Sequence, residues 1–293
     1  MYNLSNIGTI KTILQRYGFS FSKTLGQNFL INPHVCPKMA EQCGIDINTG
    51  VIEVGPGIGV LTCELAKRAQ KVVAVELDKR LIPILNESLS DFNNVKIIND
   101  DIIKIDLKQL IQHEFAGMNV VVCANLPYYI TTPIIMKLLE EQLKISAITV
   151  MVQKEVAQRI CAGAGTRLSG SISLAVQYYS EPEILFAVKS GSFMPAPKVD
   201  SAVVKLNIRK KPVCDVSDEK LFFQVIKAAF SQRRKTILNS VSGHFNISKK
   251  LLLLILNQIG ISENCRAENL NLEKFAKLTN ALNFSMSETF LAK

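Results

Sequence analysis

The sequence has no tryptophan, only three histidines and no closely paired cysteines among its 293 residues. The seven cysteines form no CxxC pair, and the nearest two, Cys36 and Cys43, are seven positions apart. This spacing argues against a disulfide framework and against a zinc site. We therefore predict that the protein binds no metal and that its cysteines are reduced thiols, as is usual in the cytoplasm.

Long hydrophobic runs and low-complexity tracts are also missing. The longest aliphatic run, LLLLIL at 251–256, is far shorter than the roughly 20 residues that a membrane-spanning helix needs. The first 19 residues lack an unbroken apolar core followed by small residues, so we expect no signal peptide. Together with 48% hydrophobic residues, this predicts a cytoplasmic protein with no membrane association and about two domains.

Positive charge is concentrated near the C-terminus. Residues 1–204 contain 19 Lys and Arg against 18 Asp and Glu, whereas 205–293 contain 15 against 7. Nearly all of the net charge of +9 therefore belongs to the last third of the chain. Solubility alone can account for scattered lysines, but a polyanion such as nucleic acid is the more specific interpretation.

From residue 49 onward, short apolar runs alternate with helical stretches. The runs show little polar alternation, which is typical of parallel strands covered on both faces, so we predict an α/β fold with a doubly wound sheet. The five predicted strands of this region are 51–55, 71–77, 95–100, 119–125 and 147–153. Three later segments are expected to close the sheet as further strands: 171–180, 183–190 and 201–209.

A change of character near residue 212 predicts a domain boundary. The stretch KKPVCD at 210–215 has the composition of a linker, and the apolar positions beyond it follow helical spacing. We therefore expect a domain of residues 1–212, with an N-terminal extension of 1–48, and a small basic all-helical domain of 213–293.

A glycine-rich turn follows the first predicted strand. Gly55 and Gly57 belong to a GxGxG sequence that opens a helix, and Glu76 ends the next strand, 21 residues after Gly55. Glycines allow a ligand close to the backbone, and an acid at this distance accepts hydrogen bonds from ribose hydroxyls. The third glycine comes one residue too early for the dinucleotide pattern, which favours S-adenosylmethionine (SAM) over NAD.

Two more polar positions end later strands. Asp100 and Asp101 follow the third strand, where a carboxylate accepts a hydrogen bond from an adenine amino group, and the residues alone do not choose between them. Asn125 ends the fourth strand. The carboxyl ends of parallel strands share one edge of the sheet, where ligands bind in open α/β folds, so we expect these positions to surround one site.

The sequence Asn125-Leu126-Pro127-Tyr128 predicts the chemistry of that site. An exocyclic adenine amine is a weak nucleophile because its lone pair is delocalised into the ring. The Asn125 amide oxygen and the Leu126 carbonyl can accept its N–H groups, Pro127 fixes the backbone that carries them, and Tyr128 offers a stacking face. A second stacking face is predicted at Phe193, since an aromatic flanks two prolines there.

Several segments together resemble the KsgA/RsmA family of small-subunit rRNA adenine N6,N6-dimethyltransferases. They are KTLGQNFL (23–30), VIEVGPGIGVLT (51–62), VAVELD (73–78), CANLPYYITTP (123–133), SFMPAPKVDSAVV (192–204) and AAFSQRRKTILNS (228–240). The resemblance covers nearly the whole chain. It implies a Rossmann-like SAM-dependent methyltransferase domain with a mostly parallel seven-stranded sheet, and a C-terminal helical domain that contacts RNA.

The resemblance also implies a reaction and a set of site residues. The reaction is dimethylation of two adjacent adenosines in the 3′-terminal hairpin loop of 16S rRNA, within the immature 30S subunit, by a monomer. The extension 1–48 would cover the cofactor site, Asp101 would be chosen over Asp100, and Tyr128 and Phe193 would sandwich the target base. The SAM contacts would be Gln27, Asn28, Leu30, Gly55, Gly57, Glu76, Asp101 and Asn125; the RNA contacts would be Arg233, Arg234 and Lys235.

Three alternatives stand beside this interpretation. An Erm-type enzyme that methylates one adenine of the large-subunit rRNA shares the glycine turn and the stacking aromatics, although NIPY is its more usual signature. A non-catalytic RNA-binding relative is disfavoured by the intact glycine turn and NLPY sequence. A dehydrogenase is disfavoured by the glycine spacing.

Overall fold

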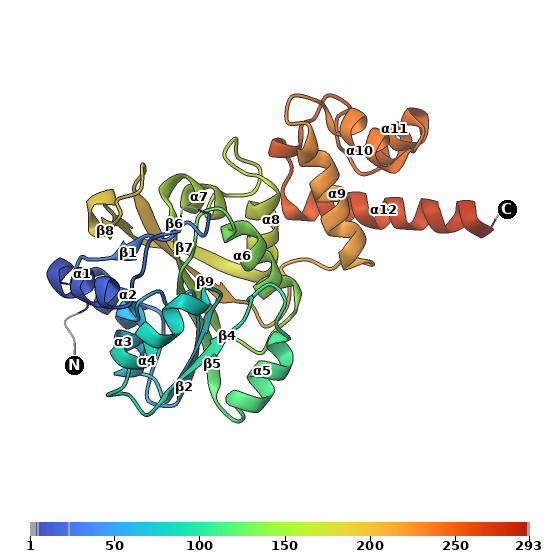
Figure 1. The fold of residues 1–293 in the computed structure, drawn as a ribbon. Helices are drawn as coiled ribbons and strands as arrows, with labels where there is room; N and C mark the ends of the chain where they lie inside the picture. The colour runs from blue at the N-terminus through green and yellow to red at the C-terminus, as the bar shows by residue number, and fades with distance from the viewer. Residues whose placement is uncertain (1–3, 5, 23, 292–293) are drawn as a thin grey trace. The chain divides into compact units, whose positions relative to one another are not determined.

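The computed structural model describes residue 4, residues 6–22 and residues 24–291, so Lys23 of the KTLGQNFL segment lies outside the described residues. The chain forms two compact units (Figure 1). The first unit contains residues 1–157 and 181–208, and the second contains residues 158–180 and 209–293. None of the described helices is long and apolar enough to cross a membrane.

A seven-stranded sheet organises the first unit, in the order β4-β3-β2-β5-β6-β9-β7. The strands from β4 to β6 are parallel to their neighbours, and β9 runs antiparallel to β6. The predicted doubly wound, mostly parallel sheet is therefore confirmed. Its strands are β2 (Thr49–Val54), β3 (Lys71–Glu76), β4 (Val95–Asn99), β5 (Asn119–Asn125), β6 (Ala147–Gln153), β7 (Ser180–Val188) and β9 (Ser201–Ile208).

The central strands form because their side chains are apolar on both faces. Every residue of β2 is buried, as are the five central residues of β5. On one face, Val51, Val72 and Val121 pack with residues of the helices that follow β1 and β2. Burial on both sides is what a crossover helix between parallel strands produces.

The helices of this unit cover the sheet (Figure 1). They are α1 (Ile7–Arg16), α2 (Val35–Gln42), α3 (Val60–Ala66), α4 (Ile82–Ser88), α5 (Leu107–Glu114), α6 (Thr131–Glu140) and the start of α7 (Lys154–Ile160), with 3₁₀ turns at η1 (Lys79–Leu81) and η2 (Ser190–Ser192). The apolar face of α1 packs through Ile10 and Ile13 against Ile84 and Leu85 of α4. The N-terminal segment is thereby fixed beside the sheet before the chain reaches β1.

A two-stranded ribbon connects two segments that are far apart in the sequence. Strand β1 (Phe29–Leu30) pairs antiparallel with β8 (Phe193–Met194), and Leu30 lies opposite Phe193. The Asn32 side chain adds a hydrogen bond to the Ser192 hydroxyl at 3.1 Å. This ribbon holds the segment that follows α1 next to the segment that precedes β9.

The second unit is helical. Its helices are the end of α7, α8 (Ser171–Tyr179), α9 (Glu219–Ser231), α10 (Ile237–Phe245), α11 (Lys249–Gln258) and α12 (Leu272–Leu291), with a 3₁₀ turn at η3 (Ala267–Asn269). Asp218, Thr236 and Ser248 cap α9, α10 and α11 by accepting a backbone N–H three residues ahead. The all-helical character predicted for the C-terminal region is confirmed.

The prediction of a strand at 171–180 is wrong, because this segment is helix α8. Its apolar run is too short and too uniformly apolar to separate a strand from a buried helix by periodicity. The helix begins where the Gly170 N–H donates to the Ser173 hydroxyl. Tyr178 then packs against Phe222 of α9 with its ring tilted, and Tyr179 stacks on Phe223. This aromatic packing joins residues 158–180 to the second unit. The boundary predicted at 212/213 had assigned these residues to the first domain.

Candidate active site

A cavity lies at the carboxyl ends of β2, β3 and β5, and its empty space, together with the solvent at its open side, is about 1070 Å³. Its lining includes every predicted cofactor and catalytic residue except Phe193: Gln27, Asn28, Leu30, Gly55, Gly57, Glu76, Asp101, Asn125, Leu126, Pro127 and Tyr128. All of these residues belong to the first unit. The parallel strands bring them together because each strand delivers one or two polar positions to the same edge.

The glycine turn after β2 places backbone at the wall of the cavity. Gly55 and Gly57 have φ angles of 66° and 62°, a left-handed conformation that favours glycine. A Cβ atom added to Gly55 would meet nothing within 4 Å, so it would project into open space. A Cβ atom on Gly57 would lie 3.2 Å from the Phe29 ring. The turn therefore leaves room for a ligand at Gly55 and packs against β1 at Gly57.

Glu76 is a buried carboxylate at the end of β3. Its Oε1 accepts the Asp78 N–H at 2.8 Å, and its Oε2 accepts the Gly57 N–H at 3.3 Å. Burial raises the pKa of Glu76 to about 7, and the two N–H donors oppose the rise. The carboxylate is thus held in place by backbone amides, with acceptor capacity left for the hydroxyl groups of a ribose.

Glu53 is a second buried acid of this cavity, and it was not among the predicted site residues. It lies on β2 directly before the glycine turn, and among the described residues no group bonds its Oε2 atom. Burial raises the pKa of Glu53 to about 8, with a smaller contribution from the nearby charge of Glu76. Its signal in the sequence was a single acid inside an otherwise apolar strand, which is costly unless the acid is neutral.

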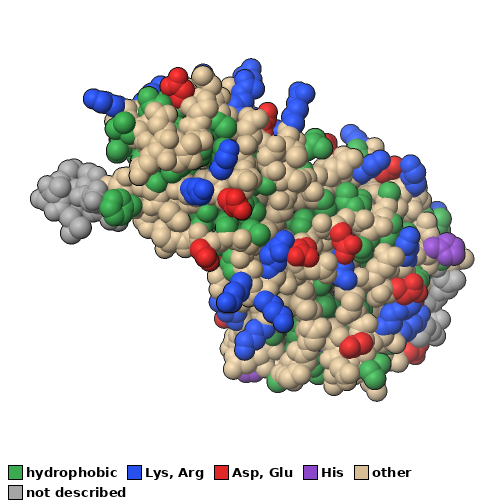
Figure 2. Space-filling model, turned by 180° about the vertical axis from the view of Figure 1, so that it is seen from behind, with side chains coloured by type: hydrophobic (Ala, Val, Ile, Leu, Met, Phe, Trp, Pro, Cys, Tyr) green, Lys and Arg blue, Asp and Glu red, His purple; other side chains and the backbone are tan. Residues whose placement is uncertain are grey.

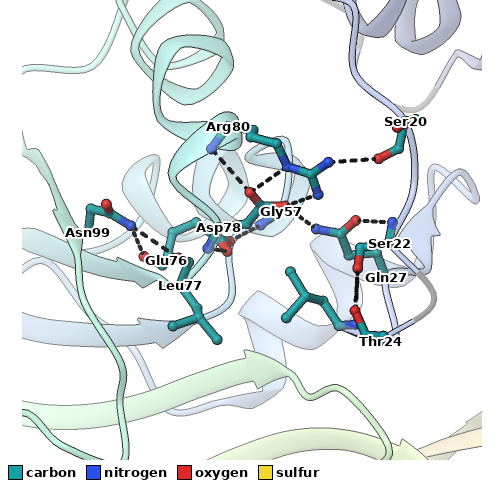
Figure 3. Close-up of polar contacts among 11 residues, drawn as sticks. Ser20, Ser22, Thr24, Gln27, Gly57, Glu76, Leu77, Asp78, Arg80 and Asn99 are labelled. Carbon is teal, nitrogen blue, oxygen red and sulfur yellow. Dashed lines mark hydrogen bonds and ion pairs between the residues drawn. The ribbon is translucent and has the colours of Figure 1, made fainter.

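Gln27 is engaged in a polar network that the sequence did not reveal (Figure 3). Its Nε2 donates to Asp78 Oδ2 at 2.8 Å, and its Oε1 accepts the Ser22 N–H at 2.8 Å. Arg80 holds the same Asp78 carboxylate through Nε and Nη2 and lies over the Phe19 ring. The hydrogen bonds of Arg80 lower the pKa of Asp78. The network holds Phe19, Ser22 and Gln27 beside one another, so the Gln27 amide stabilises the position of this segment next to the cavity.

Asp100 and Asp101 both line the cavity. Asp101 Oδ1 accepts the Ile103 N–H at 3.0 Å, and its backbone carbonyl accepts two further N–H groups of the following turn. Asp100 Oδ1 accepts the Asp101 N–H at 2.7 Å. Asp101 is thus the better fixed of the two, although the assignment of the adenine contact to it stays a prediction.

The NLPY segment forms a fixed turn between β5 and α6. The Leu126 N–H donates to the Met151 carbonyl at 3.2 Å, and the Pro127 carbonyl accepts from Ile130 N–H and Thr131 Oγ1. Asn125 lines the cavity, and its Nδ2 donates to the Asn28 carbonyl at 3.3 Å. Among the described residues no group donates to its Oδ1 atom, so this amide oxygen keeps its capacity to accept a hydrogen bond from a ligand.

Tyr128 is anchored by its hydroxyl group. Its Oη atom lies 2.7 Å from the Ser201 hydroxyl at the start of β9, and partial burial raises the pKa of the phenol. The ring is half-buried and lines the cavity. Tyr128 thus has the fixed orientation that a stacking surface requires.

Comparison with known proteins identifies the family of the chain that forms this cavity. The sequence profile described as "Ribosomal RNA adenine dimethylase" matches residues 18–283. The chain belongs to this family. Its relatives include proteins named ribosomal RNA small subunit methyltransferase A from Bacillus mycoides strain KBAB4 and Bacillus cereus strain B4264, each 49% identical over 286 residues, which cover 96% of this chain and 98% of the relative.

Solved structures agree with this family assignment. A dimethyladenosine transferase from Plasmodium falciparum is 27% identical, with a TM-score of 0.71 over 88% of this chain and 98% of its own. The 23S rRNA methyltransferase ErmE is 25% identical, with a TM-score of 0.66 over 87% of this chain and 100% of its own. Membership makes the chain an rRNA adenine dimethyltransferase with a Rossmann-like catalytic unit, and SAM is its methyl donor.

The residues present in this dimethyltransferase fit SAM. The open space in front of Gly55 admits a ligand against the backbone, and Glu76 supplies carboxylate oxygens at the next strand end. The cavity is also bounded by apolar side chains, including Ile58, Leu77 and Ile102. A flat adenine with an attached ribose needs this combination of apolar walls and a few polar contacts.

Phe193 does not form the second stacking face in this structure. Its side chain is only 3% exposed and belongs to the core cluster with Leu30 and Val188. The pairing of β8 with β1 places it there, since Phe193 lies opposite the buried Leu30. The second stacking face predicted at Phe193 is therefore not exposed in this structure, and a stacking role for this residue stays a prediction.

The three predicted RNA contacts lie in the second unit, in a turn between α9 and α10. Gln232, with φ −131° and ψ 77°, ends α9, and Thr236 caps α10. The helical spacing predicted beyond residue 212 is thus interrupted at this point, and the turn exposes Arg233, Arg234 and Lys235. Arg233 donates to the Arg167 carbonyl at 2.9 Å and lies 3.7 Å from Glu268. Arg233 therefore also stabilises the fold of this unit.

Proposed function

We propose that this dimethyltransferase transfers methyl groups from SAM to N6 of two adjacent adenosines in the 3′-terminal hairpin loop of 16S rRNA. The observation that carries the proposal is the NLPY turn, whose Asn125 lines the same cavity as Glu76 and Gly55 and engages its Nδ2 atom with the Asn28 carbonyl. The names of the relatives at 49% identity support the small subunit as the substrate.

The chain's own residues would act mainly by positioning. Asn125 Oδ1 and the Leu126 carbonyl would accept the two N–H groups of the adenine amine, which draws its nitrogen toward tetrahedral geometry. That geometry localises the lone pair on nitrogen, so the amine becomes a better nucleophile. Preorganised dipoles of this kind lower a barrier because they need no reorganisation during the reaction.

Bound SAM would supply an electrophilic methyl group on a sulfonium centre. Glu76 would hold its ribose hydroxyls, Asp101 its adenine amine, and the backbone at Gly55 and Gly57 would border its methionine portion. The methylated nitrogen carries a positive charge and loses its proton readily to solvent. No strong general base is required, and the cavity lining contains no histidine.

The target adenosine must leave its stack to reach the cavity, as in other enzymes that modify bases. Tyr128 would provide one stacking face, held by its hydroxyl contact with Ser201. Arg234 and Lys235 of the second unit would contact phosphates, since both are exposed in the turn after α9.

The deciding experiment uses subunits from a strain in which the gene for this chain has been deleted. Purified small and large subunits are each incubated with the protein and labelled SAM, and the modified positions are mapped by primer-extension stops. We expect label in the small subunit, at two adjacent adenosines with two methyl groups each. Label in the large subunit alone would contradict the proposal and favour the Erm-type alternative, to which the likeness with ErmE points.

The setting of the reaction completes the proposal. We infer that the protein acts in the cytoplasm, as a monomer, on the immature 30S subunit. Light scattering of the purified protein tests the monomer, and comparison of immature with mature small subunits as substrates tests the assembly stage.

A further inference from the structure

Tyr129 differs from the other described tyrosines of the chain. Tyr17, Tyr128, Tyr178 and Tyr179 each have a hydroxyl hydrogen bond to a side chain. Among the described residues, none bonds the Tyr129 hydroxyl, and the Tyr129 side chain is 55% exposed. The fold therefore gains little from an aromatic ring at this position.

The backbone under Tyr129 is nevertheless fixed. The residue lies in the turn that the Pro127 carbonyl closes with Ile130 N–H and Thr131 Oγ1. Leu126, three positions earlier, is 1% exposed and anchors the turn in the core. An exposed ring on a fixed turn costs less conformational entropy on binding than one on a mobile loop.

The Tyr129 ring also has a defined support. Gly26 has a φ angle of 59°, and a Cβ atom built on it would lie 3.3 Å from Tyr129 Cδ1 and 3.7 Å from Pro127 Cβ. The N-terminal segment therefore passes against the ring through a residue without a side chain. Because Tyr129 lines the cavity and is more than half exposed, the ring lies at the open side of the cavity.

We propose that Tyr129 is a stacking platform for the RNA base next to the target adenosine. This inference rests on the proposed function, in which two adjacent adenosines are methylated in turn. When one base enters the cavity, its neighbour loses a stacking partner and remains at the entrance. An aromatic ring there can replace that partner, and every base has a face that it can accept. Phe193 cannot fill this role in the structure, because it is buried.

The test compares Tyr129→Ala, Tyr129→Phe and Tyr129→Leu in binding to a short RNA hairpin with two adjacent loop adenosines, measured by fluorescence anisotropy. We expect Tyr129→Ala to raise Kd for the hairpin roughly 5- to 100-fold, the range for loss of one base–aromatic stack. Tyr129→Phe retains the aromatic face and should bind the hairpin like the wild type. Tyr129→Leu lacks that face, so its Kd should be nearly as high as that of Tyr129→Ala. Tyr17→Ala, at an exposed tyrosine outside the cavity lining, is the matched control.

A second arm locates the base. Each loop adenosine is replaced in turn by an abasic site, and one replacement should weaken binding to the wild type but not further weaken binding to Tyr129→Ala. Calorimetry with SAM should give the same affinity for the wild type and all variants, and melting temperatures should confirm that they fold.

Four results would overturn the inference. The first two are unchanged RNA binding by Tyr129→Ala and wild-type RNA binding by Tyr129→Leu. The others are an abasic replacement that weakens binding to Tyr129→Ala as much as to the wild type, and a loss of SAM affinity in Tyr129→Ala as large as its loss of RNA affinity. These arms need no turnover, so they are independent of the subunit assay. If the wild type methylates small subunits and Tyr129→Ala binds RNA normally, only this inference is wrong. If the wild type leaves small subunits unmethylated, the proposed function is wrong, whatever the binding arms give.

Discussion

The two units of the chain differ in how firmly they fix their functional side chains. At the edge of the sheet, Glu76 is held by two backbone N–H groups and Asn125 by a backbone carbonyl. In the helical unit, Arg234 and Lys235 are exposed in a turn between two helices. The first arrangement is suited to directional chemistry on one atom, and the second to a diffuse contact with charged phosphates.

The charge distribution follows the same division. Residues 1–204 are almost balanced in charge, whereas 205–293 carry most of the excess of Lys and Arg. Lys and Arg side chains are prominent among the charged side chains on the face drawn in Figure 2. Phosphate contacts tolerate imprecise placement because the attraction is not directional, while hydrogen bonds to an amine require geometry. A substitution at a functional residue of the first unit should therefore reduce activity more than a substitution at an RNA contact of the second unit.

The largest effect is expected from Asn125→Ala. Loss of a preorganised acceptor at the reacting nitrogen should lower kcat about 100- to 1000-fold, as loss of one polar group does in other active sites. SAM affinity should change little, because Glu76 and the glycine turn remain. The measurement is single-turnover methyl transfer together with calorimetry for SAM.

Asn119→Ala provides the control for that variant. Asn119 begins the same strand, β5, at its opposite end, and its side chain is exposed. It should transfer methyl groups at the wild-type rate. Equal activity of Asn125→Ala and Asn119→Ala would mean that the amide at the cavity has no part in the chemistry.

The next effect concerns Glu76 and pH. Its pKa of about 7 is raised above the ordinary value, so the carboxylate is progressively protonated as the pH falls below 7. Because ribose hydroxyls need an acceptor, SAM affinity should decrease by up to about tenfold per pH unit below that pKa. Glu76→Gln should bind SAM about 10- to 100-fold more weakly at pH 8, as expected for loss of a charged hydrogen bond.

The signature of that role is the pH profile. Glu76→Gln should show an almost flat SAM affinity between pH 6 and 8, whereas the wild type should not. Glu114→Gln is a suitable control, since this partly buried carboxylate pairs with Lys71 and Lys96 away from the cavity lining. A wild-type affinity that does not vary over this range would remove the support for a ribose contact at Glu76.

The sequence predicted the sheet edge well because parallel strands place their carboxyl ends together whatever the details of packing. Gly55, Glu76 and Asn125 could be assigned to one edge from strand order and spacing alone. Phe193 and Gln27 could not be placed, since their surroundings depend on long-range partners. The position of Phe193 is determined by the pairing of β8 with β1. The position of the Gln27 side chain is determined by the carboxylate of Asp78, which is 51 residues away.

The helical unit was harder to predict for a different reason. Helical spacing continues across residues 228–240, and only the caps at Gln232 and Thr236 separate α9 from α10. The strand predicted at 171–180 failed because a short apolar run fits a buried helix equally well. In the second case tertiary packing, including the stack of Tyr179 on Phe223, decided the outcome.

A smaller effect is expected when the charge of the turn is reversed. Arg234→Glu should weaken binding to the rRNA hairpin about 3- to 10-fold, and should reduce the slope of log K against log salt by about 0.7 for each phosphate of single-stranded RNA that is no longer neutralised. Arg233→Glu should also lower the melting temperature, because Arg233 donates to the Arg167 carbonyl. Lys277→Glu on α12 is the control for added charge within the same unit. A salt slope that is the same for all three variants would mean that the turn does not meet RNA.

The last prediction concerns stability, where no effect on methyl transfer is measured, and its residue is Glu53. Its folded pKa of about 8 is far above the ordinary value for a glutamate, so folding takes up a proton at neutral pH. The unfolded state binds fewer protons between pH 4.5 and 8, and the free energy of unfolding therefore decreases as the pH rises through this window. Glu53→Gln removes the ionisation but keeps the shape, so its melting temperature should fall less steeply than that of the wild type from pH 5 to 8. Thermal unfolding at constant ionic strength measures the difference, and Glu64→Gln, a neighbouring acid whose pKa is lowered, should not flatten the profile. Parallel profiles for the wild type and Glu53→Gln would mean that Glu53 is charged in the folded protein, and that the edge of the sheet accommodates a buried anion beside Glu76.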